Sequence, residues 1–404
     1  MPRVIVMGGS VGGLTAALVL RDIGCEVRVF ERSSAALQAR GAGIAALDAT
    51  LRYLTERGGR QRADVCSSTS WIRFLRPDGS VQHEQRHRYL FSSWNTIYRS
   101  LLELFDPACY LLGSEVTAFA QSGDSVRVTL ADGSAADAGL LVCADGVSSL
   151  ARARLLPDVR PSYSGYVAWR GTLPEQALTA ATRRRFGDAI TYQVLKDSHV
   201  LVYPIPGPGG ALTAGDRLVN FVWYVNVAEG AELDELMTGR DGIRRPVSLP
   251  PGAATDQAVT AMRQAAAARF APPIAAVATG VGEPFVQVVY DIAVPRMVFG
   301  RAGRYRGTAS CRRCRGTGRA GPGRGRPAGV PSWPARPARR RRRPRVPRPG
   351  PSRQRRPWPC PRPHAGGPRR PRRRSGRSGR TSSGGRRCRR RPGRTARPRR
   401  SPRS

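Results

Sequence analysis

The chain has 404 residues and a formal net charge of +40, but almost all of that charge lies in its last quarter. Residues 301–404 hold 38 arginines and no acidic residue, whereas residues 1–300 hold 30 Lys and Arg against 28 Asp and Glu. The first 300 residues therefore have an ordinary charge balance and are long enough for two lobes. Their most apolar stretch, residues 4–20, contains four glycines, which excludes a membrane-spanning helix there.

The same stretch also lacks the features of an export signal. No small-residue cleavage site precedes Arg21 and Asp22, so we expect no secretion. The four cysteines of the first 300 residues show no framework spacing. Both features indicate a reducing, cytoplasmic location.

The first thirty residues predict a strand, a tight turn, a helix and a second strand. Val4–Met7 is an apolar run typical of a buried parallel strand, and a glycine-rich turn follows it over residues 8–13. Apolar residues at helical spacing fill residues 14–20, and a second strand over residues 26–30 ends at Glu31. This order is typical of a dinucleotide-binding βαβ unit.

Each part of this unit has a physical role. Gly8 permits the sharp turn, Gly13 lets the helix approach the strand, and the helix N-terminus offers N–H groups to a pyrophosphate. Glu31 can accept hydrogen bonds from a ribose and would repel a 2′-phosphate, which disfavours NADP at this site. Ser10 replaces the middle glycine of G-x-G-x-x-G. The residues predicted to hold the dinucleotide are Gly8, Ser10, Val11, Gly13, Glu31 and Arg32.

A second fingerprint lies near residue 145, where a buried strand at residues 140–143 runs into an Asp-Gly pair and a helix. At this point the chain resembles the class A flavoprotein aromatic hydroxylases, in which that pair lies near the flavin pyrophosphate. In the alternative interpretation Asp145 only caps a helix. The matching residues are Asp137, Ala144, Asp145, Gly146, Ser149 and Arg152, and Cys143 replaces a usual glycine.

The resemblance implies two further FAD contacts. Arg40 opens the segment RGAGI beyond Glu31, and Arg99 is expected at the start of a helix as a flavin-contacting arginine. An ordinary surface arginine is the alternative for Arg99.

Further segments narrow the resemblance to the 2,6-dihydroxypyridine 3-hydroxylase branch of this family, in which a serine at the position of Ser10 is familiar. The resemblance runs from residue 3 to about residue 301. The segments include GGSVGGLTAALVLRDIG, SSWNTIYRSLLELF, YSGYVAWRGTLPE, NFVWYVNVAEG and YDIAVPRMVFGR.

The implied fold is α/β: a Rossmann-type FAD-binding domain, GR2-like and of the para-hydroxybenzoate hydroxylase type, is interwoven with a β-rich substrate domain. We expect the FAD-binding domain to be discontinuous, over residues 1–70, 95–160 and 265–301. The substrate domain is expected over residues 71–94 and 161–264.

Two segments of the middle region are rich in β-branched and aromatic residues, which predicts antiparallel strands. Aromatic side chains on such a sheet can form one wall of a pocket for a small aromatic substrate, or can simply be core. The predicted wall residues are Trp169, Tyr192, Trp223 and Tyr224.

The resemblance also implies a reaction. FAD is reduced by NADH or NADPH, then reacts with O₂ to form a C4a-hydroperoxide that hydroxylates an activated ring. A general base near neutral pH suits ionisation of the substrate hydroxyl, and His199 is the candidate, with a structural histidine as the alternative. No metal site is expected, and a homodimer is compatible with the sequence.

At Arg301 the resemblance stops. In this family a buried strand, a Gly-Asp pair that binds the flavin ribityl chain, and a covering helix come next, and all three are missing here. We therefore expect weak or absent FAD retention and poor solubility. Residues 302–404 are rich in Arg, Pro and Gly and nearly devoid of aliphatic residues, so we expect a disordered tail.

Two interpretations of this tail compete. A genuine arginine-rich tail would bind nucleic acid or another polyanion nonspecifically. A frameshift in GC-rich DNA is the favoured interpretation, because the chain has one lysine, Lys196, and evolved basic tails usually mix Lys with Arg. A zinc site is not expected among the cysteines and the histidine of the tail, Cys311, Cys314, Cys360 and His364.

We predict that the coding DNA, resequenced over codons 295–320 and translated in all three frames, continues in another frame with the missing strand, Gly-Asp pair and helix. A DNA sequence in which no frame does so would contradict the frameshift, and the arginine-rich tail would then be genuine.

Overall fold

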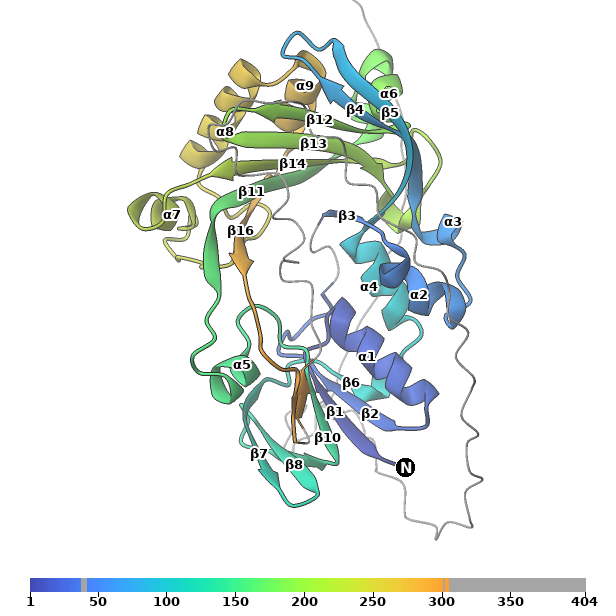
Figure 1. Cartoon of the computed structure of the whole chain (residues 1–404), viewed down its shortest axis with the longest axis vertical. Coiled ribbons are helices and arrows are strands. Elements are labelled where there is room, and N and C mark those ends of the chain that lie inside the picture. Colours follow the sequence, from blue (N-terminus) through green and yellow to red (C-terminus); the bar gives the residue numbers. More distant parts are fainter. Residues whose placement is uncertain (38–41, 301, 305–404) are drawn as a thin grey trace, which may run out of the picture. The chain divides into compact units, whose positions relative to one another are not determined.

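The computed structural model describes residues 1–37, 42–300 and 302–304. The predictions for Arg40, for the Gly-Asp pair and for the disordered or frameshifted tail from residue 305 onward lie outside these residues. Between them the described residues form a six-stranded sheet, a nine-stranded sheet and a three-stranded sheet (Figure 1).

The six-stranded sheet carries the predicted dinucleotide-binding unit. Strand β1 lies at its centre and pairs in parallel with β2 on one side and β10 on the other. The sheet order is β17-β18-β10-β1-β2-β6. The strands are β1 (Arg3–Met7), β2 (Glu26–Phe30), β6 (Tyr110–Leu111), β10 (Leu140–Cys143), β17 (Val298–Phe299) and β18 (Ala302–Arg304).

Both faces of this sheet are covered, which explains the unbroken apolar run of β1. Val4 and Val6 pack against helices on one face, and Ile5 and Met7 pack on the other. The first face carries α1 (Val11–Asp22), α2 (Asp48–Glu56), α3 (Arg62–Val65) and α4 (Trp94–Leu102). The second carries the three-stranded sheet β7 (Val116–Ser122), β8 (Ser125–Leu130) and β9 (Ala135–Ala138), together with α5 (Leu150–Leu155).

The nine-stranded sheet is mostly antiparallel and forms the predicted β-rich lobe, in the order β15-β16-β11-β14-β13-β12-β4-β5-β3. Its one parallel pair joins β12 to β4. The strands are β3 (Gly43–Ala45), β4 (Ser67–Leu75), β5 (Val81–Ser93), β11 (Ser162–Pro174), β12 (Ala189–Leu195), β13 (Ser198–Ile205), β14 (Leu218–Asn226), β15 (Ser248–Leu249) and β16 (Phe285–Asp291).

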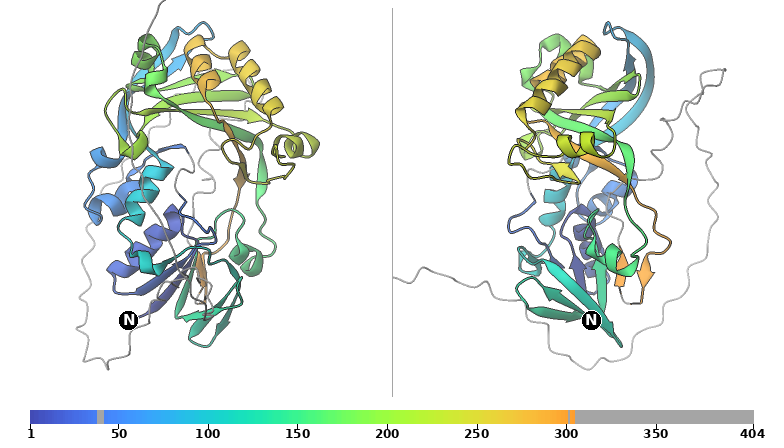
Figure 2. Two further views of the ribbon diagram at one scale, coloured as in Figure 1. Left: turned by 180° about the vertical axis from the view of Figure 1, so that it is seen from behind. Right: turned by 90° about the vertical axis from the view of Figure 1, so that its left-hand side faces the viewer.

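One face of this sheet is covered by helices, as Figures 1 and 2 show for α8 and α9. Alternate residues of β11, β13 and β14, such as Trp169, Val200 and Phe221, point into the core beneath them. The helices are α6 (Ala180–Phe186), α7 (Ala231–Leu236), α8 (Asp256–Arg269) and α9 (Pro272–Gly280), and short 3₁₀ turns lie at Pro107–Cys109, Glu175–Ala177 and Pro208–Gly210.

The α/β fold with a β-rich second lobe is confirmed, but part of the chain predicted for the FAD-binding lobe lies on the nine-stranded sheet. Residues 265–291, predicted to return to the FAD-binding lobe, instead complete α8, α9 and β16 on the nine-stranded sheet. The apolar faces of α8 and α9 pack on that sheet, which keeps the segment there. Among the described residues after 264, only Val298–Phe299 and Ala302–Arg304 lie in the six-stranded sheet, as β17 and β18.

The strand predicted to be missing after Arg301 is present in part. Residues 302–304 pair in parallel with β10, from Leu141 to Cys143. The expectation failed because a ladder of backbone hydrogen bonds needs no particular side chains, and the edge of β10 was free to accept one.

A buried ion pair holds the connection between β13 and β14. Glu175, 1% exposed, accepts hydrogen bonds from Arg217 at 2.8 and 3.1 Å and from the Gly215 N–H at 2.7 Å. Burial acts to raise the pKa of Glu175, but the Arg217 and Gly215 donors outweigh it and the pKa is lowered. The carboxylate is therefore charged and fully satisfied in the folded protein.

We predict that Arg217→Ala destabilises the protein by about 3–5 kcal/mol, because it leaves the Glu175 charge buried and unpaired. Urea unfolding of the two proteins at pH 7 measures the difference. Since the folded pKa of Glu175 is depressed, its contribution is present above its unfolded pKa of about 4.3 and is lost as the pH falls through the folded value. A difference that stays the same down to pH 2 would contradict this assignment.

Candidate active site

The turn after β1 is built from glycines that have no room for side chains. Gly8 has φ +102°, and a Cβ there would meet the Ala144 carbonyl; a Cβ on Gly13 would meet the Gly8 carbonyl. The first contact joins the turn to the second fingerprint, and the second lets α1 start directly against the turn. The roles predicted for Gly8 and Gly13 follow from these contacts.

The N-cap residue of α1 does not cap the helix with its side chain. Ser10 is the N-cap residue, yet its hydroxyl makes no capping hydrogen bond, and its carbonyl accepts the first helical bond from Leu14 N–H at 2.9 Å. The N–H groups of Val11, Gly12 and Gly13 precede the first helical hydrogen bond. A helix N-terminus of this kind fits a pyrophosphate, so the residues present fit an FAD.

Glu31 lies directly after β2 and is 6% exposed. One of its carboxylate oxygens accepts from Gly9 N–H at 2.8 Å, and the other accepts from Ser33 N–H at 2.9 Å. The carboxylate therefore holds the glycine turn itself. Each oxygen keeps a second lone pair for the predicted ribose contact.

Two tyrosines that sequence reasoning missed complete this cradle. The Tyr110 hydroxyl donates to the Gly9 carbonyl at 2.9 Å and lies 3.1 Å from the Tyr98 hydroxyl, which accepts from Leu37 N–H at 3.1 Å. Burial, Tyr98 and the Glu31 charge raise the pKa of Tyr110, so it stays neutral. A tyrosine at the start of a two-residue strand gives no sequence signal for this role.

The other predicted FAD contacts are spread around the cradle. The Asp145 carboxylate accepts from Ala151 N–H of α5 at 3.1 Å, so it does contribute to a helix start, although Ser149 is the N-cap residue. Gly146 has φ +78° and is exposed. Arg32 is exposed, and Arg99 is an exposed residue in the second turn of α4, not at its start.

The face of the nine-stranded sheet opposite α8 and α9 is lined by tyrosines. This tyrosine face is defined by Tyr89, Tyr192, Tyr203 and Tyr224. His199 lies on it across from Tyr224, with ring centroids 4.9 Å apart, and both are half-buried. Burial lowers the pKa of His199, which keeps the imidazole neutral and able to accept a proton.

The structure separates the four aromatic residues predicted to form one wall. Tyr192 and Tyr224 lie on the tyrosine face, but Trp169 and Trp223 are 4% and 3% exposed in the core beneath α8 and α9. Trp223 packs edge-on against Phe270, 5.1 Å away. Trp169 and Trp223 pair with each other across β11 and β14, so the strand period of two sends both to the covered face.

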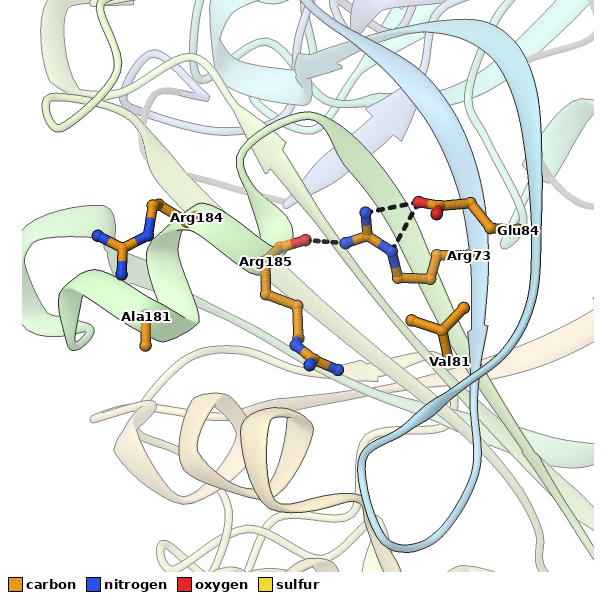
Figure 3. Close-up of a pocket in the computed structure, with 6 residues that line it drawn as sticks. All are labelled: Arg73, Val81, Glu84, Ala181, Arg184 and Arg185. Carbon is orange, nitrogen blue, oxygen red and sulfur yellow. Dashed lines mark hydrogen bonds and ion pairs between the residues drawn. The ribbon is translucent and has the colours of Figure 1, made fainter.

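A hollow of about 340 Å³ lies elsewhere on the β-rich lobe, between α6 and the β4–β5 hairpin (Figure 3). Arg73 donates to Glu84 at 2.6 and 2.9 Å and to the Arg185 carbonyl. Arg185 in turn donates to the Gly79 carbonyl. These arginines therefore hold the hairpin to α6, and the hollow is separate from the tyrosine face.

Two further searches cover the described residues alone. Within residues 1–37, 42–300 and 302–304, no group of three His, Cys, Asp or Glu side chains could hold a metal ion. Over the same part of the chain, no helix has the length and apolar character needed to cross a membrane.

The glycine turn between β1 and α1, with an acidic residue at the end of β2, defines a two-lobed dinucleotide-binding α/β protein. The chain belongs to the FAD-dependent aromatic monooxygenases. It is 39% identical over 303 residues to the 2,6-dihydroxypyridine 3-monooxygenase of Paenarthrobacter nicotinovorans, a match that covers 74% of each chain. The resemblance inferred from the sequence is confirmed.

Other comparisons agree. The structure of 2,6-dihydroxypyridine-3-hydroxylase from Arthrobacter nicotinovorans matches with a TM-score of 0.71 at 36% identity, covering 75% of this chain and 76% of that one. The 6-hydroxynicotinate 3-monooxygenase of Bordetella bronchiseptica is 30% identical over 191 residues, 43% of this chain and 48% of the relative. Family models described as "Pyridine nucleotide-disulphide oxidoreductase" and "FAD binding domain-like" match residues 3–59 and 163–291.

We predict that Gly13→Ala lowers the free energy of unfolding by about 1–3 kcal/mol, because the new methyl group would overlap the Gly8 carbonyl and force α1 away from the turn. Gly282→Ala is the matched control, since no atom lies within 4 Å of its Cβ position. Thermal unfolding of both variants measures the effect. Equal melting temperatures would contradict the close approach of α1 to the turn.

Proposed function

We propose that the chain binds FAD at the turn between β1 and α1 and hydroxylates an activated aromatic or N-heteroaromatic ring, of dihydroxypyridine type, on the tyrosine face. The observation that carries this proposal is the pairing of an uncapped helix N-terminus beside Glu31 with an aromatic sheet face that no helix of the described residues covers. The relatives named for dihydroxypyridine and hydroxynicotinate support the substrate class.

Bound FAD would supply the redox chemistry, which is the acceptance of two electrons from NADH or NADPH and the activation of O₂. The overall reaction balances as one ring C–H, one O₂, one NAD(P)H and one proton giving one ring C–OH, one water and NAD(P)⁺. The residues of the chain have other tasks. Glu31 and Tyr110 hold the turn through the N–H and C=O of Gly9, and the helix N-terminus offers donors to the pyrophosphate.

On the tyrosine face, the side chains would orient the ring and exclude water. Tyr192 and Tyr224 are half-buried and offer ring faces and hydroxyl groups, and burial raises the pKa of Tyr192, so that it remains a neutral donor. His199 would accept the proton of the substrate hydroxyl, which makes the ring more electron-rich. We place Trp169 and Trp223 in the core and assign them no contact with the ring.

The proposal is tested by incubating the full chain with excess FAD, NADH or NADPH, 2,6-dihydroxypyridine and ¹⁸O₂. FAD is kept in excess because its retention is expected to be weak, and a chain that works as proposed gives a hydroxylated product that carries one ¹⁸O atom. Oxidation of the nicotinamide without ¹⁸O in the product would overturn the hydroxylase assignment. Absence of FAD uptake even with FAD in excess would overturn the proposal and favour the alternative, an inactive remnant of the family.

A second prediction concerns His199. Because burial lowers its pKa below the ordinary value of about 6.5, the base form persists into mildly acidic solution, and we expect the acidic limb of kcat/KM to lie below pH 6.5. His199→Asn should remove this limb and lower kcat about 10²- to 10⁴-fold. An unchanged acidic limb in the variant would show that another group titrates.

A further inference from the structure

One peptide group joins the two lobes. The carbonyl of Ala42 accepts from Trp94 N–H, the first residue of α4, at 3.1 Å. The N–H of the same peptide, on Gly43, donates to Asn220 Oδ1 of β14 at 2.7 Å. The peptide is therefore held from both sides, by a helix of the FAD-binding lobe and by a strand of the nine-stranded sheet.

The next carbonyl is held as well. Gly43 C=O accepts from the Tyr203 hydroxyl of β13 at 3.0 Å and from Arg170 Nη2 of β11 at 2.5 Å. Arg170 Nη1 donates to Gln287 on β16 at 2.8 Å, which fixes the guanidinium. Side chains from three neighbouring strands thus converge on a single residue, and we name Arg170, Tyr203 and Asn220 the Gly43 clamp.

Packing at this point requires glycine. A Cβ on Gly43 would lie 2.7–2.8 Å from atoms of Asn220, Ile205 and Tyr203, closer than ordinary contact. The clamp therefore grips the backbone directly. Strand β3 has only three residues and pairs with the end of β5, so the clamp supplies much of what holds it.

Helix α4 carries this contact to the dinucleotide cradle. Trp94 at its start touches the clamped peptide, and Tyr98, one turn later, stacks on Trp94 at 4.9 Å. The Tyr98 hydroxyl lies 3.1 Å from that of Tyr110, which donates to the Gly9 carbonyl. A continuous path of hydrogen bonds and one rigid helix therefore runs from Asn220 to the glycine turn.

We propose, on the basis of the proposed function, that Arg170, Tyr203 and Asn220 are positioning residues that couple the tyrosine face to the FAD cradle through the Ala42–Gly43 peptide and α4. Tyr203 belongs to the tyrosine face and stacks on Phe91 at 4.2 Å, so a ring bound there would press on a residue of the clamp. Retention of FAD then depends on side chains of the other lobe.

The test compares Tyr203→Phe with Tyr163→Phe in the full chain. Both changes remove one hydroxyl that donates to a backbone carbonyl, but Tyr163 bonds Val227 at 2.9 Å, away from the clamp. Backbone hydrogen exchange of the apo chain is followed at Gly43 and at Gly9. FAD dissociation is followed by the recovery of flavin fluorescence.

For Tyr203→Phe we expect faster exchange at both Gly43 and Gly9 and a rise of about 3- to 10-fold in the Kd of FAD, the loss of one ordinary hydrogen bond. Tyr163→Phe should change neither. Exchange that rises at Gly43 but not at Gly9, or equal behaviour of the two variants, would overturn the coupling. If the parent chain binds no FAD, the proposed function fails, and exchange at Gly9 still decides the coupling by itself.

Discussion

The contact between Gly8 and Ala144 is the constraint on which the rest of the FAD-binding lobe depends. Gly8 N–H donates to the Phe30 carbonyl and Ala144 N–H donates to the Met7 carbonyl, both at 2.8 Å, so the ends of three parallel strands meet at one edge. A side chain at Gly8 would overlap the Ala144 carbonyl. The glycine turn of the first fingerprint therefore packs directly against the backbone of the second fingerprint. The two fingerprints lie more than a hundred residues apart in the chain.

From this edge the cradle is built by satisfying buried polar groups. Glu31 is a buried carboxylate, which is stable because two backbone N–H groups compensate its charge. One of those groups belongs to Gly9, whose carbonyl is taken by Tyr110. Gly9 therefore binds the Glu31 carboxylate through its N–H and the Tyr110 hydroxyl through its carbonyl. The Tyr110 hydroxyl in turn contacts Tyr98 of α4. The need to satisfy the polar groups of the turn therefore favours α4, which carries Tyr98, as the helix beside it.

The sequence predicted the elements better than it predicted which way their side chains point. Alternation in β14 identifies a strand, in which Trp223 and Tyr224 point to opposite faces of the sheet. Which of the two faces is buried depends on α8 and α9, which cover one of them. Arg99 does not lie at the start of α4 as predicted, because the N-cap residue is Ser93, six residues before it. Tyr110 and Asn220 act through backbone groups distant in sequence, and such contacts leave no local pattern.

A strand can be held in a sheet by backbone hydrogen bonds, by side-chain burial or by both, and β18 shows the first of these. Strand β18 adds backbone hydrogen bonds to β10, and these form whatever the side chains are. Strand β1, by contrast, joins the sheet through its backbone and also through side chains that are buried on both faces. The ladder therefore continues past Arg301, where the resemblance inferred from the sequence ends. The turn proposed to hold FAD is fixed by contacts among β1, β2, α1 and Tyr110, and residues before Arg301 make all of these contacts.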